Sequence, residues 1–171
     1  VEVNGEAGND TITTGLGDDS ISGGIGHDLI NSGSGRDTVW AGDGNDTIIA
    51  HVENDEIKGG DNDDLIHFDI PRFGVGASSD VMFDGGEGID TLNMRSISQY
   101  ATVLVDFTAG RIRITDGPNN FKFSFTNIEK FTGSDRISYS GLEIDAPSVY
   151  KLGNGNTQAS DNYWPSLVKP G

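Results

Sequence analysis

Hydrophobic residues in the first part of the chain recur at a fixed period of nine, and such a short, regular period is typical of a solenoid. From Gly5 to His67 the sequence divides into seven units of nine residues without a gap. The eighth residue of every unit is aliphatic: Ile12, Ile21, Ile30, Val39, Ile48, Ile57 and Ile66. Its two neighbours are mostly polar, as in Thr11-Ile12-Thr13. This alternation predicts a short strand with one inward side chain per unit.

The first six residues of each unit are rich in Gly, Asn and Asp, and this composition predicts a turn. A turn and a strand that alternate in this way coil into a flattened helix of parallel strands. Two units make one coil, because the chain has to turn at both edges to return over itself. Odd and even units therefore stack on opposite sides, with successive strands about 4.8 Å apart. Glu2-Val3-Asn4 fits the strand of an earlier unit, since Val3 precedes Ile12 by nine residues.

The sixth residue of every unit is Asp, and the coil arranges these residues in two rows. Asp10, Asp28, Asp46 and Asp64 follow one edge, and Asp19, Asp37 and Asp55 follow the other. Carboxylates stacked about 5 Å apart repel one another strongly unless a cation lies between them. Glycines at the second and fourth positions tolerate positive φ and let carbonyl groups crowd together. The resulting shell of oxygen atoms favours calcium over magnesium. One aliphatic residue per unit is a thin core, so we expect ion binding and folding to be coupled.

These repeats resemble the hemolysin-type calcium-binding nonapeptide of RTX proteins, G-G-x-G-x-D-x-U-x, in which U is a large aliphatic residue. The unit Gly23 to Asn31, GGIGHDLIN, matches every defined position, and one more unit, GGEGIDTLN, follows at Gly85 to Asn93. The resemblance implies an all-β fold, a parallel β-roll that continues into wider, irregular coils. It also implies several calcium ions bound between neighbouring turns on the same edge.

Carried over to this chain, the resemblance assigns calcium binding to the sixth-position carboxylates and to the turn glycines before them. The residues are Asp10, Asp19, Asp28, Asp37, Asp46, Asp64 and Asp90, with Gly8, Gly15, Gly17, Gly24, Gly26, Gly33, Gly35, Gly42 and Gly44. The sixth unit departs from the pattern, because His51 and Glu53 replace its two turn glycines. We therefore expect only a weak site at Asp55.

Beyond the seventh unit the pattern predicts three further regions. Residues 68–84 form an insertion loop that ends in a strand at Val81 to Phe83, and residues 85–141 continue the solenoid with a hairpin. Strands are expected at 102–106, 111–115 and 121–125, and the alternating Phe121, Phe123 and Phe125 are expected in the core. Residues 142–171 are expected to be a C-terminal cap or tail, with Tyr163-Trp164-Pro165 closing the end of the core.

The net charge of −16 is concentrated in the repeats, since residues 1–67 hold 15 acidic and 2 basic residues and so carry −13. Because these acids are periodic, bound cations explain them better than disorder does. Such a polyanion is a poor candidate for binding nucleic acid or an anionic membrane. The chain has no Cys and no apolar stretch long enough to cross a membrane. The RTX resemblance implies type I secretion from a bacterium and an extracellular or cell-surface location.

No catalytic constellation is recognisable in the sequence. The three histidines occupy unrelated positions in their units, and neither a H-E-x-x-H nor a G-x-S-x-G motif occurs. We therefore assign no catalytic residue to this chain. Three interpretations stay open: a calcium-folded structural module of a secreted or cell-surface protein, a module that binds polysaccharide, ice or another surface protein, and the non-catalytic tail of a secreted protease, lipase or polysaccharide-modifying enzyme.

Overall fold

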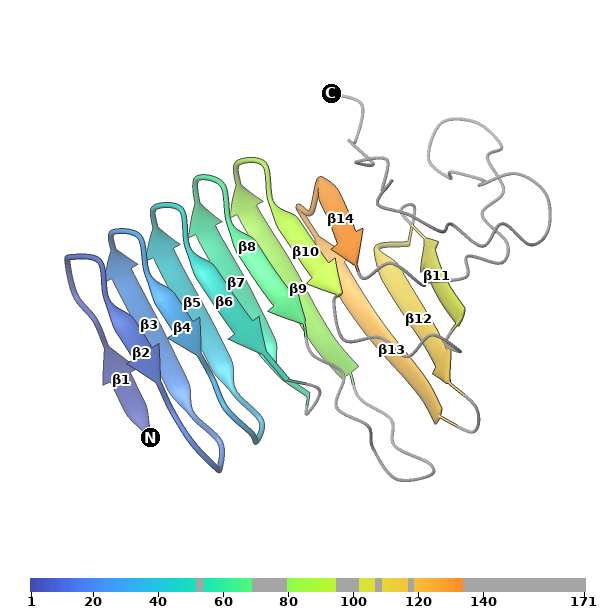
Figure 1. The fold of residues 1–171 in the computed structure, drawn as a ribbon, viewed down its shortest axis with the longest axis horizontal. Helices are drawn as coiled ribbons and strands as arrows, with labels where there is room; N and C mark the ends of the chain where they lie inside the picture. The colour runs from blue at the N-terminus through green and yellow to red at the C-terminus, as the bar shows by residue number, and fades with distance from the viewer. Residues whose placement is uncertain (52–53, 69–79, 95–101, 107–108, 117–118, 134–171) are drawn as a thin grey trace.

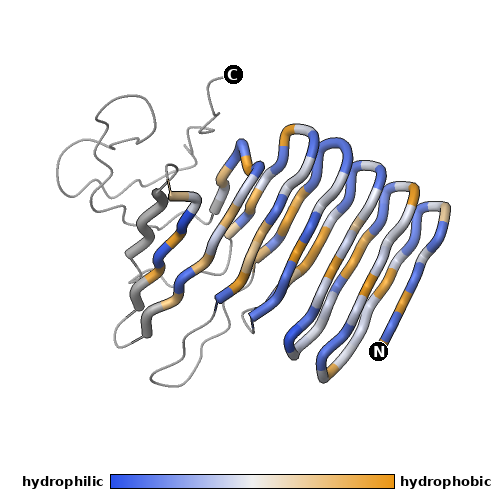
Figure 2. Tube along the Cα trace, turned by 180° about the vertical axis from the view of Figure 1, so that it is seen from behind, coloured by the Kyte–Doolittle hydropathy of each residue, from blue (hydrophilic) through white to orange (hydrophobic). Residues whose placement is uncertain are grey.

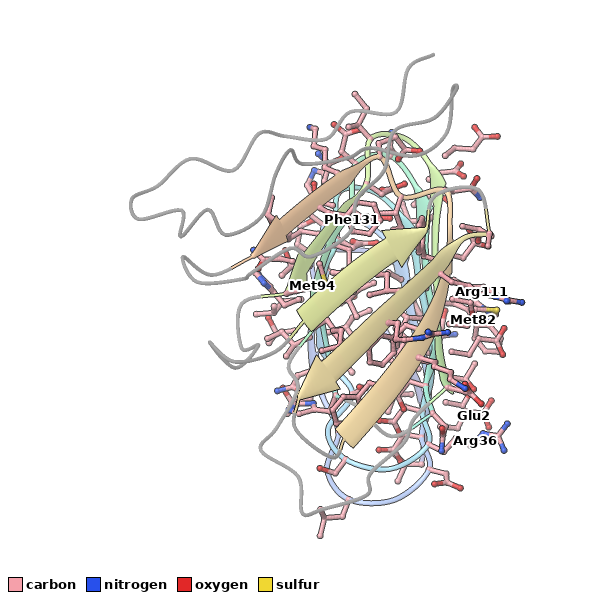
Figure 3. The ribbon with its side chains drawn as sticks, turned by 90° about the vertical axis from the view of Figure 1, so that its right-hand side faces the viewer. Glu2, Arg36, Met82, Met94, Arg111 and Phe131 are labelled. Atoms are coloured by element: carbon pink, nitrogen blue, oxygen red, sulfur yellow. The ribbon has the colours of Figure 1, made fainter. Side chains whose placement is uncertain are left out.

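Two β-sheets stacked face to face make up the regular structure (Figures 1 and 3). The computed structural model describes residues 1–51, 54–68, 80–94, 102–106, 109–116 and 119–133. The proposed cap at 142–171, with Tyr163-Trp164-Pro165, lies outside these residues, as does 69–79 of the insertion. Within the described residues no helix is long and apolar enough to cross a membrane.

From β1 to β10 the strands alternate between the two sheets along the chain, as two units per coil require. The eight-stranded sheet has, in spatial order, β1 (Glu2–Asn4), β3 (Ser20–Ile25), β5 (Thr38–Asp43), β7 (Glu56–Asp61), β9 (Asp80–Glu87), β13 (Asn119–Thr126), β12 (Arg111–Asp116) and β11 (Thr102–Asp106). The six-stranded sheet has β14 (Lys130–Gly133), β10 (Thr91–Met94), β8 (Leu65–Phe68), β6 (Thr47–Ala50), β4 (Leu29–Asn31) and β2 (Thr11–Thr13).

The register of the strands confirms the predicted parallel roll. Ile21 of β3 pairs with Val39 of β5, and Ile12 of β2 pairs with Ile30 of β4, so one coil contains 18 residues. Val3 of β1 pairs with Ile21, so the strand expected before the first unit is also present. The period of nine thus determines which residues become neighbours, because each residue stacks on its counterpart two units later.

The insertion lengthens one coil without changing the register around it. Met82 of β9 lies opposite Glu56 of β7, and Leu92 of β10 lies opposite Ile66 of β8. This coil therefore spans 26 residues instead of 18, eight more than the others. The unit at Gly85 to Asn93 consequently returns to the positions that the sequence pattern predicts.

In the repeats the core consists of one large aliphatic side chain per unit, and toward the C-terminal end it becomes aromatic. The eighth-position residues of units two to seven are fully buried, and Figure 2 shows them as apolar bands within the polar trace. Phe68 packs edge-to-face on Phe83 and Phe123, with ring centroids 5.1 and 4.7 Å apart. Phe121 and Phe125 are also buried, which confirms that the three alternating phenylalanines belong to the core.

The C-terminal strands add one more coil and a hairpin. β13 pairs in parallel with β9, and β14 pairs in parallel with β10, so these two strands continue the roll. β12 is antiparallel to both of its neighbours, β13 and β11, and these last two strands extend only the large sheet. The two residues between β12 and β13 allow an antiparallel return, whereas a parallel return would need a full coil.

The tight stacking of turns predicts a stability difference between two second-position glycines. Gly42 has φ +118°, and a Cβ there would collide with the carbonyl of Gly24, whereas a Cβ at Gly15 would meet no atom within 4 Å. We expect Gly42→Ala to lower the free energy of unfolding by about 1–3 kcal/mol and Gly15→Ala to change it little. Urea unfolding at a fixed, saturating calcium concentration measures both variants. Equal losses would show that stacking does not restrict the second position.

Candidate metal sites along the two edges of the roll

The sixth-position aspartates form the two predicted rows, and one oxygen of each carboxylate is fixed by the backbone. Along the first edge the amide of Asp10 donates to Oδ1 of Asp28, and Asp28 donates to Asp46 in the same way, at 2.8 and 2.7 Å. The row continues through Asp64 to Asp90, again at 2.8 Å. On the second edge Asp19 donates to Asp37 and Asp37 to Asp55, at 2.9 and 2.8 Å.

The other oxygen of these carboxylates is buried and has no hydrogen-bond partner. This holds for Oδ2 of Asp10, Asp19, Asp28, Asp37, Asp46, Asp64 and Asp90. Burying a charged oxygen without a partner is costly, and native proteins seldom do so unless a cation binds there. A hard cation such as calcium is the partner that this repeated arrangement fits.

The free oxygens converge with backbone carbonyls beside the first residue of those odd units that begin with glycine, which are the first, third and seventh. A Cβ added to Gly23 would collide with Oδ2 of Asp28 and with the carbonyl oxygen of Ala41 in the next coil. A Cβ added to Gly59 would collide with Oδ2 of Asp64 and with the carbonyl of Gly85 in the same way. Carboxylate and carbonyl oxygens from successive coils therefore share one small space. The sequence analysis did not identify this role of the first position.

A second ladder, formed by fifth-position side chains, runs in the opposite direction along the roll. Asn9 Oδ1 accepts from the amide of His27, and Asp18 Oδ1 accepts from the amide of Arg36, both at 2.9 Å. His27 takes part through Nδ1, which accepts from the amide of Asn45 at 2.8 Å. Fifth-position side chains thus bond to the following coil and sixth-position ones to the preceding coil. The fifth-position side chains are hydrogen-bonded to backbone amides. The carboxylate oxygens without a hydrogen-bond partner therefore come from the sixth position.

The turn glycines named from the sequence differ in backbone conformation. Positive φ is found at Gly8, Gly17, Gly24, Gly26, Gly33, Gly35, Gly42 and Gly44, and not at Gly15. In the sixth unit a positive φ of +71° is found at Asn54, at the fifth position. In the glycine-containing units named above, the positive φ is at the second or fourth position.

The two rows have different lengths. The register that pairs Glu56 with Met82 stacks Val81 on Asp55 in the next coil. Val81 is apolar and buried, so the second row of aspartates ends there. The first row continues past Asp90, because Oε2 of Glu129 accepts from the Asp90 amide at 3.0 Å. Glu129 was not identified from the sequence, since the turn before it does not follow the nonapeptide pattern.

Burial and mutual repulsion make these carboxylates hard to ionise. Burial, followed by interaction with neighbouring acids, raises the pKa of Asp46 to about 6, of Asp64 to about 7 and of Asp90 to about 6. Burial also raises the pKa of Asp37. The pKa of Asp19 is lowered instead, because the Val1 ammonium group bonds to its carboxylate. Two charges about 5 Å apart repel by roughly 3 kcal/mol at an effective dielectric constant near 20.

Each turn supplies one carboxylate, and the remaining oxygen atoms come from the backbone. Among the described residues no three His, Cys, Asp or Glu side chains gather into one metal-binding group. A metal between two coils would therefore depend on carbonyl oxygens as much as on aspartate. That mixture of ligands suits the six- to eight-fold oxygen coordination of calcium better than the side-chain clusters that bind zinc.

Comparison with known proteins agrees with this chemistry. A family model described as the RTX calcium-binding nonapeptide repeat (4 copies) matches residues 4–39 and again residues 40–70. The matched region contains all seven consecutive units and both rows of aspartates up to Asp64. No curated protein matches the chain.

The raised pKa values predict how the calcium-free fold responds to pH. Because the folded pKa values of Asp46, Asp64 and Asp90 lie above the ordinary value of 3.8, protonation stabilises the fold. This stabilisation is fully present below about pH 4 and is lost as the pH rises through 6 to 7. In calcium-free buffer we expect more β-structure by circular dichroism at pH 5 than at pH 8.

The variant Asp64→Asn should reduce this pH dependence, and Asp61→Asn, which changes an exposed side chain, should preserve it. Identical spectra at the two pH values in the unmodified protein would contradict the assignment of the buried carboxylates as the responsive groups.

Proposed function

Residues 4–70 are RTX calcium-binding nonapeptide repeats, and from this premise we propose that the chain is a calcium-folded structural module of a bacterial protein secreted by the type I route. RTX repeats bind several calcium ions in each array, and proteins that contain them are generally secreted. The observation that carries the proposal is the row of buried Oδ2 atoms without hydrogen-bond partners. Each of these atoms belongs to the one acidic residue that every unit retains.

We assign calcium binding to the sixth-position carboxylates and to the turn carbonyls of neighbouring coils on each edge. Oδ1 orients each carboxylate through its bond to the preceding coil, and Oδ2 is left to meet the ion. Bound calcium supplies the positive charge that offsets repulsion between successive aspartates. Where the first position is glycine, as at Gly23 and Gly59, the missing side chain leaves room for the converging oxygens.

This arrangement links folding to the compartment that the protein occupies. Extracellular-type calcium sites bind with dissociation constants of about 10⁻⁴–10⁻³ M. Such sites stay empty in the cytosol and fill outside the cell. The buried charges then oppose folding before export and favour it after export, because metal binding and folding are one event. An unfolded chain is the form that passes through a narrow export channel.

A calcium titration followed by circular dichroism tests this proposal. After treatment with a chelator at pH 7.5 we expect a largely disordered spectrum, and millimolar calcium should restore a β-rich spectrum cooperatively. Magnesium at the same concentration is the control, and we expect it to restore little. A β-rich spectrum that persists unchanged in excess chelator would refute calcium-dependent folding.

The same titration compares individual sites. Asp28 belongs to a unit with every defined glycine, whereas Asp55 follows the altered turn at Asn54 and ends its row at Val81. Asp28→Ala should therefore raise the calcium midpoint more than Asp55→Ala does. Equal shifts would show that the turn conformation does not determine the quality of a site.

We also propose, as a second candidate function, that the outer face of the large sheet binds an acidic polysaccharide. A cavity of about 560 Å³ lies over β12 and β13. Three exposed cationic residues line it, Arg111, Arg113 and Lys122, with Asp80 at its margin. Figure 3 shows Arg111 on the outer side of the sheet, near Met82. Arg113 lies directly opposite Lys122 in the sheet, so their charges are adjacent.

This local positive charge is unusual in a chain of net charge −16. Arginine and lysine at one site favour carboxylate or sulfate groups, through charge-assisted hydrogen bonds. Ice binding is not supported, because the outer positions of the small sheet do not form a regular array. In that sheet Thr11 stacks on Leu29 and Thr13 stacks on Asn31. The proposal applies equally if the chain is the non-catalytic tail of a secreted enzyme.

Binding of dextran sulfate to the calcium-loaded protein tests the acidic-polysaccharide proposal, with uncharged dextran as the ligand control. We expect the double variant R111Q/R113Q to bind at least about tenfold more weakly, and the affinity to fall as salt increases. Arg36→Gln is the matched protein control, because Arg36 is exposed on a turn of the roll. Equal affinity of the double variant and the unmodified protein would refute the proposal.

A further inference from the structure

We infer that one more calcium site lies at the C-terminal end of the first row, between the turn Gly85 to Asp90 of the last nonapeptide unit and the C-terminal turn at Asn127 to Glu129, which does not belong to a repeat. This inference rests on the proposed function, because it extends the same row of sites by one coil. The family match ends at residue 70, so the family match does not cover either of these turns.

Glu129 occupies the position that an aspartate occupies in the other coils of the first row. Thr91 of β10 pairs with Lys130 of β14, so Asp90 and Glu129 are stacked counterparts. The Asp90 amide donates to Oε2 of Glu129, just as the Asp64 amide donates to Oδ1 of Asp90. The Lys130 amide donates to the Asp90 carbonyl at 2.9 Å, as Thr91 does to Asp64. The backbone pattern of the roll therefore continues through Glu129.

An unpartnered oxygen marks the place where the ion would bind. The Asp90 side chain is fully buried, and its Oδ2 has no hydrogen-bond partner. A Cβ added to Gly85 would collide with this oxygen and with the carbonyl oxygen of Asn127. The same two kinds of oxygen converge beside Gly59 one coil earlier. The repeated features thus include the free carboxylate oxygen, the carbonyl of the next coil and the missing side chain.

The C-terminal turn reaches this position with fewer residues than a repeat uses. Asn127 follows Thr126, which pairs with Asp84, and so Asn127 stacks on Gly85. Glu129 lies two positions after Asn127, whereas Asp90 lies five positions after Gly85. The left-handed φ of +51° at Asn127 turns the chain sharply. The longer side chain of glutamate then provides the reach to the Asp90 amide.

A calcium ion at this site would join the roll to the aromatic C-terminal coil. Glu129 lies between β13 and β14, which contribute the buried Phe125 and Phe131. The rings of these two residues pack edge-to-face with centroids 5.0 Å apart. Ion binding between Asp90 and Glu129 would therefore stabilise the packing of β14 on β10. The C-terminal coil becomes calcium-dependent although it contains no nonapeptide repeat.

Glu129→Gln tests this site, because glutamine keeps an oxygen that accepts from the Asp90 amide and removes the charge. Glu87→Gln is the matched control, since Glu87 is an acid in the same turn as Asp90 and its side chain is exposed. Isothermal titration calorimetry counts the bound ions. We expect Glu129→Gln to lose one ion per molecule, or to bind one ion at least about tenfold more weakly. Glu87→Gln should match the unmodified protein.

Hydrogen exchange provides a second measurement that does not depend on counting ions. At limiting calcium, Glu129→Gln should lower amide protection in residues 130–133 and leave residues 38–43 unchanged. Unaltered stoichiometry, affinity and protection in Glu129→Gln would overturn the inference while the repeats still bind calcium. Failure of the unmodified protein to bind calcium would instead overturn the proposed function itself.

Discussion

The rest of the structure depends on the stacking of ionisable carboxylates inside the turns. From Asp28 onward the sixth-position aspartates bond through Oδ1 to the preceding coil, which fixes the spacing of the coils and also holds the charges close together. The interaction that organises the roll therefore also opposes it, and near neutral pH a counterion resolves the conflict. Each repeat unit adds only one large aliphatic side chain to the core between the sheets. Because this core is thin, the charges in the turns determine when the chain folds.

The sequence was sufficient to predict the roll because its repeat is exact where the structure is regular. The pairing of Ile12 with Ile30 and the two rows of aspartates follow directly from a period of nine. The return to register at Gly85 could also be predicted, since that unit again has the defined pattern. The convergence of oxygens beside Gly23 could not, because it combines an oxygen of Asp28 with the carbonyl of Ala41 in the next coil.

Prediction was incomplete wherever the period breaks. Val81 stacks on Asp55 only because of the register of the longer coil. The length of the insertion alone does not predict which of its residues stacks on Asp55. Glu129 joins the first row through a shortened turn, so no spacing in the sequence indicates it. The antiparallel course of β12 between β13 and β11 depends on short connections, and alternation of hydrophobic residues does not distinguish the two directions.

The unequal rows give the roll two edges with different mechanical properties. The first edge has an acidic side chain in every coil from Asp10 to Glu129, whereas the second changes from charged to apolar at Val81. When counterions are withdrawn, repulsion lengthens the first edge along its whole extent and the second only up to Asp55. The coils beyond Phe83 then tilt instead of separating evenly. Ionic conditions would thus change the curvature of the roll before its strands part.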